Sequence, residues 1–342
     1  IGGSRNKIIN GAMVIDQRNA GASVTPASTP TYTIDRWNFQ YTANSKFSTQ
    51  RSTTVPSGFT NSMLVTSLSA YSVGSGDIFL VQQSIEGFNI ADLAWGTASA
   101  ATVTLSLWVR SSLTGTFGGA LLNGAQNRSY PFTYAISSAN TWEKKSITIA
   151  GDTTGTWATD NSSGIRVTFG LGAGATYSGT AGEWVAAAKY TATSAVSVVG
   201  TNAATWHVTG VQLEVGSTAT EFESRSFGEE LALCERYCFV MAPSTNAAVA
   251  PAFARTTTVA FGIAELPVTM RATPTLAFSS NTDFQVQYLE AVATSTAMAA
   301  SPELHKNMIA FTATVGSGLT AGQGMYIRDL NGGATITASA EL

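Results

Sequence analysis

Alternating apolar and polar positions predict β-strands through most of this chain. The clearest run is residues 102–110, where every second side chain is apolar: Val103, Leu105, Leu107 and Val109. Trp108 and Arg110 fall on the opposite face of that strand. Residues 165–171 repeat the pattern and turn Arg166 outward. Each run predicts a strand with one buried face and one polar face.

Irregularities in the pattern predict where strands bend and end. Residues 206–215 also indicate a strand, but the apolar phase slips around Gly210, as a β-bulge would cause. Asn-Gly pairs and glycine-rich stretches such as residues 170–182 separate the strands. Short strands, frequent turns and few helices predict an all-β protein, a jelly-roll-like β-sandwich followed by a linking helix and a smaller C-terminal β-domain.

One segment has helical periodicity. Ser226 and Glu229 have the spacing of a capping box, and a helix is expected through residue 240. Cys234 and Cys238 would lie on one face of it, as small buried side chains. All seven tryptophans precede this helix. We therefore predict a sandwich over residues 1–225, a linking helix over 226–240 and a β tip domain over 241–342, with strands near 256–263, 283–288, 308–315 and 325–328.

Composition narrows the classes of function. Only 11% of the 342 residues are charged, with 18 Lys and Arg against 21 Asp and Glu. A nucleic-acid binder needs a basic stripe, so no nucleic-acid partner is expected. The long uncharged stretches are interrupted by Thr, Ser, Gly or Asn, so no membrane insertion is expected either. The chain begins at Ile1 and reads as a fragment or a processed product.

Several segments, taken in order, resemble the C-terminal region of tail fibres and receptor-binding proteins of tailed bacteriophages. The resemblance rests on NKIINGAM (6–13), DQR (16–18), YTIDRW (32–37), VTGVQLEVG (208–216), ATEFE (219–223), EELALCERY (229–237), LPVTMRATPT (266–275) and AEL (340–342). Residues 40–200 share only a general sequence character with these proteins, and no segment there carries the resemblance. Glu235 and Cys238 depart from the glutamine and aromatic residue expected there.

The resemblance implies a homotrimeric virion protein, with a carbohydrate-binding-like jelly roll followed by a tip that contacts the host. It would be extracellular, on the tail fibre, and would attach the virion to host surface polysaccharide or lipopolysaccharide without catalysis. Other tail proteins would bind through the part preceding residue 1. A polysaccharide-depolymerising tailspike and a purely structural virion component remain the alternatives.

Aromatic side chains among polar residues are typical of sugar-binding surfaces, because a pyranose offers an apolar face and a rim of hydroxyls. The outward pair Trp108 and Arg110 is the first candidate, with Arg166 on an equivalent face of another strand. The alternative is that a loop or a neighbouring subunit covers that face. Further glycan-binding candidates are loop or tip-domain aromatics: Trp157, Trp184, Tyr288 and Tyr326.

Catalytic and metal-binding patterns are weak. The acidic candidates for a hydrolase pair lie scattered through turns: Asp77, Glu86, Asp92, Asp152, Asp160 and Glu183. His207 and His305 are the only histidines, and no Gly-x-Ser-x-Gly elbow accompanies them. No catalytic residue, metal ligand or cofactor is therefore assigned. Calcium at the loops of Gly151-Asp152 and Asp160-Asn161 is left open, since oxygen ligands need no fixed motif.

Overall fold

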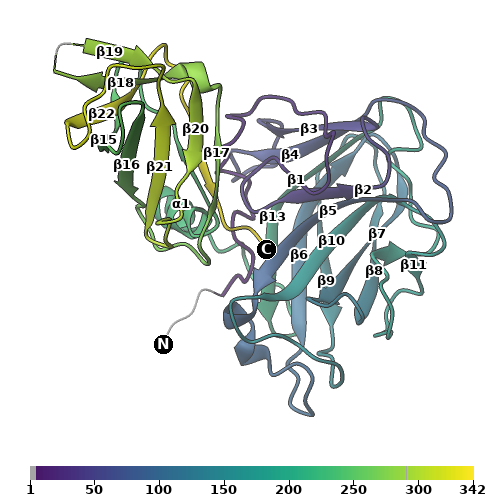
Figure 1. The fold of residues 1–342 in the computed structure, drawn as a ribbon. Coiled ribbons are helices and arrows are strands. Elements are labelled where there is room, and N and C mark those ends of the chain that lie inside the picture. The colour runs from purple at the N-terminus through teal and green to yellow at the C-terminus, as the bar shows by residue number, and fades with distance from the viewer. Residues whose placement is uncertain (1–4, 290) are drawn as a thin grey trace. The chain divides into compact units, whose positions relative to one another are not determined.

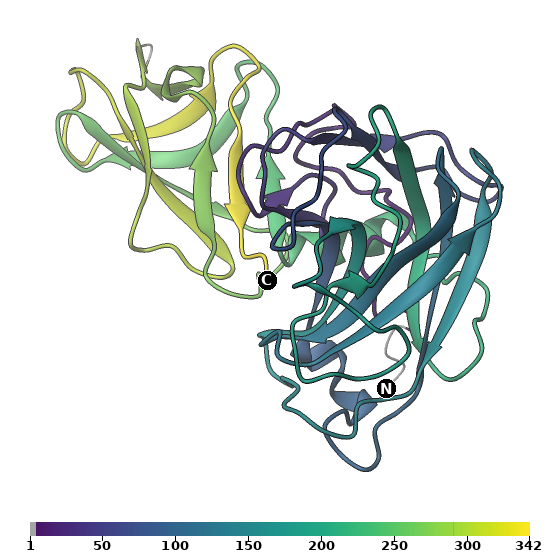
Figure 2. The same ribbon diagram turned by 90° about the vertical axis from the view of Figure 1, so that its right-hand side faces the viewer.

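The computed structural model describes residues 5–289 and 291–342, which divide into two compact units. Unit 1 comprises the described residues up to Glu230, together with Leu342, and unit 2 spans Leu231–Glu341. Figures 1 and 2 show both units as ribbons. No helix among the described residues is long and apolar enough to cross a membrane.

Unit 1 is a β-sandwich of two antiparallel sheets. The six-stranded sheet has the order β1 (Thr31–Tyr32), β2 (Asn38–Tyr41), β5 (Ile78–Glu86), β10 (Ser163–Ala173), β7 (Gly115–Asn123), β8 (Ser129–Ile136). The five-stranded sheet has the order β3 (Phe47–Ser52), β4 (Ser62–Ser67), β13 (Thr205–Val215), β6 (Val103–Ser111), β9 (Glu143–Ile149). Short elements complete the unit: β11 (Ser178–Gly179), β12 (Thr191–Ala192) and the 3-10 turns η1 (Gly87–Asn89) and η2 (Ala91–Leu93).

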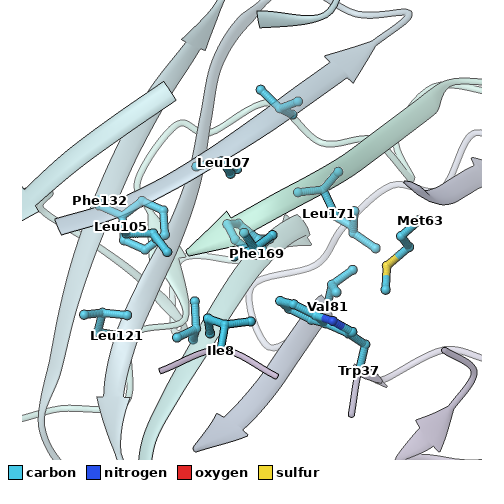
Figure 3. Close-up of a cluster of buried hydrophobic side chains, with 14 of the residues drawn as sticks. Ile8, Trp37, Met63, Val81, Leu105, Leu107, Leu121, Phe132, Phe169 and Leu171 are labelled. Carbon is cyan, nitrogen blue, oxygen red and sulfur yellow. The ribbon is translucent and has the colours of Figure 1, made fainter. Parts of the chain in front are cut away.

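The inward faces of the two sheets form one hydrophobic core, as the alternating pattern predicted. Leu105 and Leu107 from β6 meet Phe169 and Leu171 from β10 in this core (Figure 3). Its largest aromatic side chains include Trp37 and Trp206, both fully buried. Because two inner faces enclose this volume, the outward faces are left for polar residues or for covering loops.

The predicted irregularity in β13 is a β-bulge. The pairing of β13 with β6 shifts register between Thr209 and Gln212, and Gly210 has a φ of 60°. A Cβ atom at Gly210 would lie 2.6 Å from the ring of Phe59. Glycine is therefore required there both by the backbone conformation and by the close approach of that ring.

The linking helix α1 (Phe227–Glu235) is shorter than predicted. Its capping box forms: the Ser226 amide and hydroxyl donate to the Glu229 carboxylate, at 2.9 and 2.8 Å. The helix ends at Glu235, and Cys238 begins strand β14 (Cys238–Met241), paired with Ser339. The prediction of helix through residue 240 is wrong, because sheet pairing with a strand about a hundred positions away overrides the local helical period.

Unit 2 contains two sheets. The three-stranded sheet has the order β14, β23 (Ile336–Ser339), β17 (Thr275–Phe278). The seven-stranded sheet has the order β19 (Ala291–Thr294), β18 (Phe284–Tyr288), β22 (Gly324–Asp329), β15 (Ala248–Ala254), β16 (Val259–Glu265), β21 (Met308–Thr314), β20 (Ala297–Ala300). The 3-10 turn η3 (Asn281–Asp283) precedes β18. A second hydrophobic core includes Phe284 and Phe311.

The predicted fold class is confirmed: an all-β chain with a jelly-roll-like sandwich, one α-helix in the described residues and a smaller second β-unit. The division between the units falls between Glu230 and Leu231, inside α1.

Candidate functional site

The outward face of the six-stranded sheet carries a group of buried polar side chains on neighbouring strands. Asn38 of β2 lies opposite Gln82 of β5, and Ser84 of β5 lies opposite Arg166 of β10. Side chains directly opposite each other on one face of an antiparallel pair have Cβ atoms about 5 Å apart. These four residues therefore form one group, called here the polar patch.

Each member of the polar patch has a buried atom that finds no hydrogen-bond partner among residues 5–289 and 291–342. These atoms are Asn38 Oδ1, Gln82 Oε1, Ser84 Oγ and Arg166 Nε. Buried polar atoms are almost always hydrogen-bonded, and leaving one unpaired costs on the order of 1–3 kcal/mol. Four such atoms on three adjacent strands mark a place where hydrogen bonds from a molecule outside the chain would be favourable.

Two tyrosines flank the polar patch. Tyr32 of β1 lies opposite Asn38 at the edge of the sheet. Tyr190 lies over the β7 side: its carbonyl accepts a bond from the Thr168 hydroxyl (2.7 Å), and its own hydroxyl donates to Gln126 (2.8 Å). Asn38, Gln82 and Ser84 are buried, whereas Tyr32 and Arg166 are half-buried. The three buried residues thus form the floor of the patch. The ring of Tyr32 and the guanidinium group of Arg166 are its solvent-accessible parts.

A small cavity of about 100 Å³ lies farther along β10. It is lined by Gly170, Gly172, Ala173, Thr191, Ala192, Ser194, Ala195 and Val196. Thr191 Oγ1 is another buried oxygen that has no hydrogen-bond partner in the part of the chain that the structure describes. A Cβ atom at Gly170 would lie 2.6 Å from this oxygen. Any larger residue at position 170 would collide with the Thr191 side chain, so glycine is needed there for Thr191 to pack on this face.

Trp108 and Arg110 lie on the outward face of the five-stranded sheet, in β6. Arg166 is on the other sheet, so the structure does not bring the three residues together. Arg110 donates from Nε to the Asn140 carbonyl (2.9 Å), and its Nη1 is 3.3 Å from His207 Nε2. Trp108 is half-buried beside Gly210. Neighbouring residues therefore hold the Arg110 side chain in place, and Trp108 is partly covered.

His207 is buried on this same face, between Arg110 and the ring of Trp142, whose centroid is 5.8 Å away. Burial lowers the pKa of His207 to about 4, and the charge of Arg110 acts in the same direction. A neutral imidazole can accept at Nε2 from Arg110 and point its Nδ1 hydrogen toward Ser62 Oγ, 3.5 Å away. His207 therefore belongs to the packing of the sheet as a neutral side chain.

We expect this histidine to make unit 1 less stable in mild acid. Between pH 6.5 and 4 the unfolded chain binds a proton at residue 207 that the folded chain does not, so stability falls as the pH falls. The free energy of unfolding should fall by about 3 kcal/mol, which follows from the difference between the pKa of 6.5 in the unfolded chain and about 4 in the folded chain. Urea unfolding followed by tryptophan fluorescence from pH 7.5 to 4 checks this. His207→Gln should lose this part of the pH dependence, and His305→Gln, at an exposed site, should retain it. Equal profiles for the parent and His207→Gln would contradict the expectation.

Trp157 and Trp184 form a packed aromatic cluster with Trp95. Ring centroids are 4.7 to 5.4 Å apart with edge-to-face geometry, and each indole nitrogen donates to a backbone carbonyl. Trp157 is only 7% exposed. Contrary to expectation, it offers no open ring face at a loop, because the other two indoles cover it. Trp184 is half-buried and also contacts Tyr130.

Tyr288 and Tyr326 lie on opposite faces of the seven-stranded sheet. Tyr326 is opposite Gln287, the residue before Tyr288, and successive residues of a strand point to opposite faces. Tyr288 packs against the core of unit 2. The structure therefore does not join the two tyrosines into one site.

Most of the acidic candidates have partners nearby in the structure. Asp92 pairs with Lys7 (2.7 Å), and Thr42 and Gly74 donate to Asp77 and lower its pKa. The hydroxyl of Ser162 lowers the pKa of Asp160. Burial acts to raise the pKa of Asp152, but hydrogen bonds from Arg128 and Thr154 outweigh it and lower the pKa. Glu86 is buried and Glu183 is exposed.

The calcium prediction stays open. In the described part of the chain, no group of three or more His, Cys, Asp or Glu side chains is placed to hold a metal ion. At one of the two candidate loops, the Asp152 carboxylate accepts two hydrogen bonds from Arg128.

Sequence reasoning identified Arg166 but missed the rest of the polar patch. The alternation of Trp37, Phe39 and Tyr41 with Asn38 and Gln40 is a visible strand signal. It marks Asn38 as outward. It does not reveal that β2 pairs with β5 and β5 with β10, which is what brings the patch together.

No family model matches the sequence, and no curated protein matches it significantly. Among solved structures, the chain is similar to the enzymatically active domain of tailspike protein 4 of bacteriophage CBA120, with 12% identity and a TM-score of 0.34 over 62% of this chain and 22% of that one. It is also similar to a sugar-binding protein from Bacteroides thetaiotaomicron (12% identity, TM-score 0.36) and to the carbohydrate-binding module TmCBM61 in complex with β-1,4-galactotriose (9%, 0.32), each over 62% of this chain and 100% of the other.

Proposed function

We propose that unit 1 binds a glycan through the polar patch. The observation that carries the proposal is the set of four neighbouring side chains with unused hydrogen-bonding atoms, flanked by Tyr32 and Tyr190. Sugar hydroxyls both donate and accept hydrogen bonds, so they suit a floor that mixes amide and hydroxyl oxygens with a guanidinium donor. The apolar face of a pyranose packs well on a tyrosine ring.

The wider role proposed is host attachment by a bacteriophage tail fibre, without catalysis and as a homotrimer on the virion. The sequence segments at both ends of the chain and at the joint support this role by resemblance. A surface with few charges also supports it, since such a surface hydrogen-bonds sugars without being repelled by an acidic cell envelope. Several copies on one virion would convert weak single contacts into firm attachment.

The first test is binding of the full chain to an array of purified bacterial polysaccharides. Saturable binding is expected, and Tyr32→Ala should weaken it about tenfold, which corresponds to about 1.4 kcal/mol of stacking and burial. Trp108→Ala, on the opposite sheet, is the matched control and should bind as the parent does. Light scattering on the same sample measures the oligomeric state, and far-ultraviolet circular dichroism checks the fold.

Three outcomes would overturn parts of the proposal. Weaker binding in Trp108→Ala with full binding in Tyr32→Ala would move the site to the five-stranded sheet. Shortened polysaccharide after incubation would replace adhesion with depolymerisation. A folded chain that binds no polysaccharide would leave a structural role in the virion.

A further inference from the structure

We propose that the glycan bound at the polar patch is acidic and that its oxyanion, a carboxylate as in a uronic acid, pairs with Arg166. This inference rests on the proposed function and adds the class of sugar that the site selects. It follows from a comparison of Arg166 with two other partly buried arginines of unit 1, Arg128 and Arg18.

Arg166 makes no hydrogen bond and no ion pair with any residue in the ranges 5–289 and 291–342. Two other partly buried arginines of unit 1 have a carboxylate beside them. Arg128 makes two bonds to Asp152 (2.7 and 2.8 Å), and Arg18 lies 3.3 Å from Asp35. Arg166 is half-buried on the sheet, and no carboxylate in the described parts of the chain pairs with it.

The physical consequence is a site that favours an anion. Burial lowers the pKa of the Arg166 guanidinium because its charge loses hydration, and Tyr32 and Tyr190 offset only part of that loss. A carboxylate or phosphate brought to this group would restore the lost interaction in a partly dry environment, where charge-assisted hydrogen bonds are strong. A neutral sugar would restore only part of it.

The surroundings of Arg166 fit a sugar acid better than a free ion. Ser84 lies opposite Arg166, and Gln82 lies two residues from Ser84 on the same face, so the residues beside Arg166 on this face carry neutral oxygens. Tyr32 and Tyr190 are the aromatic groups whose electrostatic influence reaches Arg166. A planar guanidinium matches a carboxylate with two parallel bonds, while the neighbouring oxygens and rings suit the rest of a pyranose.

The test compares acidic polysaccharides with their own neutral forms. Affinity electrophoresis of the full chain would use polygalacturonate, alginate and polysialic acid, each beside its carboxyl-reduced form, and a phosphorylated mannan beside plain mannan. At least one acidic polymer should bind tenfold or more tightly than its neutral counterpart. Arg166→Gln should abolish that preference, and Arg110→Gln, the same change of charge on the opposite sheet, should keep it. Added salt should weaken the binding of acidic polymers to the parent. It should not weaken the remaining binding of these polymers to Arg166→Gln.

The outcomes separate this inference from the proposed function. Binding to neutral polymers as tight as to acidic ones, or an acidic preference that survives in folded Arg166→Gln, overturns the inference and leaves glycan binding intact. Preference for the phosphorylated mannan alone replaces the carboxylate with a phosphate as the anion. Absence of binding to every polymer, acidic or neutral, overturns both.

Discussion

Replacing Trp206 by alanine is expected to lower the free energy of unfolding of unit 1 by about 4 kcal/mol, the typical cost of removing a buried indole. Trp206 is fully buried, and its ring centroid lies 5.7 Å from that of Phe169. Its Nε1 donates to the hydroxyl of Tyr134 (3.2 Å), which is also buried. The substitution therefore leaves both a large cavity and a hydroxyl without its partner.

Urea unfolding of the full chain measures this effect. All seven tryptophans lie in unit 1, so indole fluorescence reports that unit and not unit 2. Tyr134→Phe, which removes only the hydrogen bond, should cost about 1–3 kcal/mol. Trp108→Ala, at a half-buried site, should cost less than Trp206→Ala. A loss below about 1 kcal/mol in Trp206→Ala would mean that the core does not depend on this ring.

The second large effect is expected at Asp152. Its carboxylate accepts bonds from Arg128 Nε (2.8 Å) and Nη2 (2.7 Å), and Thr154 donates to it as well. The Asp152 side chain is 2% exposed and that of Arg128 is 16% exposed. Asp152→Ala should destabilise unit 1 by about 3 kcal/mol, because it strands a mostly buried charge.

A double variant distinguishes loss of the ion pair from loss of packing. Arg128→Met keeps an apolar stem of similar length over Gly155, where a Cβ atom would lie 2.8 Å from the Arg128 side chain. Asp152→Ala combined with Arg128→Met should recover most of the stability that Asp152→Ala loses. If the double variant is no more stable than Asp152→Ala, the stranded charge is not the cause.

Period-two alternation was enough to find the strands whose two faces differ. Residues 102–110 and 165–171 correspond to β6 and β10, with the apolar set inward, and the phase slip at Gly210 is a bulge. Alternation was not informative for the alanine-rich strands β15, β19 and β20. Alanine is neither strongly apolar nor a strand former, so these strands owe their conformation to their neighbours in the sheet.

The polar patch depends on strand order, which local patterns do not encode. Arg166 and Ser84 are far apart in the sequence and meet only because β10 pairs with β5. The same limit explains why Trp108 and Arg166 were grouped as equivalent positions although they belong to different sheets. The face that a residue occupies could be predicted from its own strand, but its neighbours on that face could not.

The placement of β13 has a consequence for how unit 1 forms during synthesis. This strand is the middle member of the five-stranded sheet. Residues 6–11 also bond to it, through Asn6 Nδ2 to the Val211 carbonyl (3.1 Å) and Lys7 N to the Leu213 carbonyl (2.9 Å). A nascent chain in which residues 205–215 are still inside the ribosome therefore lacks the strand that joins β4 to β6.

Such long-range closure makes folding slow, and the exposed strand edges favour aggregation. Unit 1 is thus expected to fold late, after nearly all of it has been translated, and its yield should depend on chaperone capacity more than the yield of a sandwich closed by local hairpins.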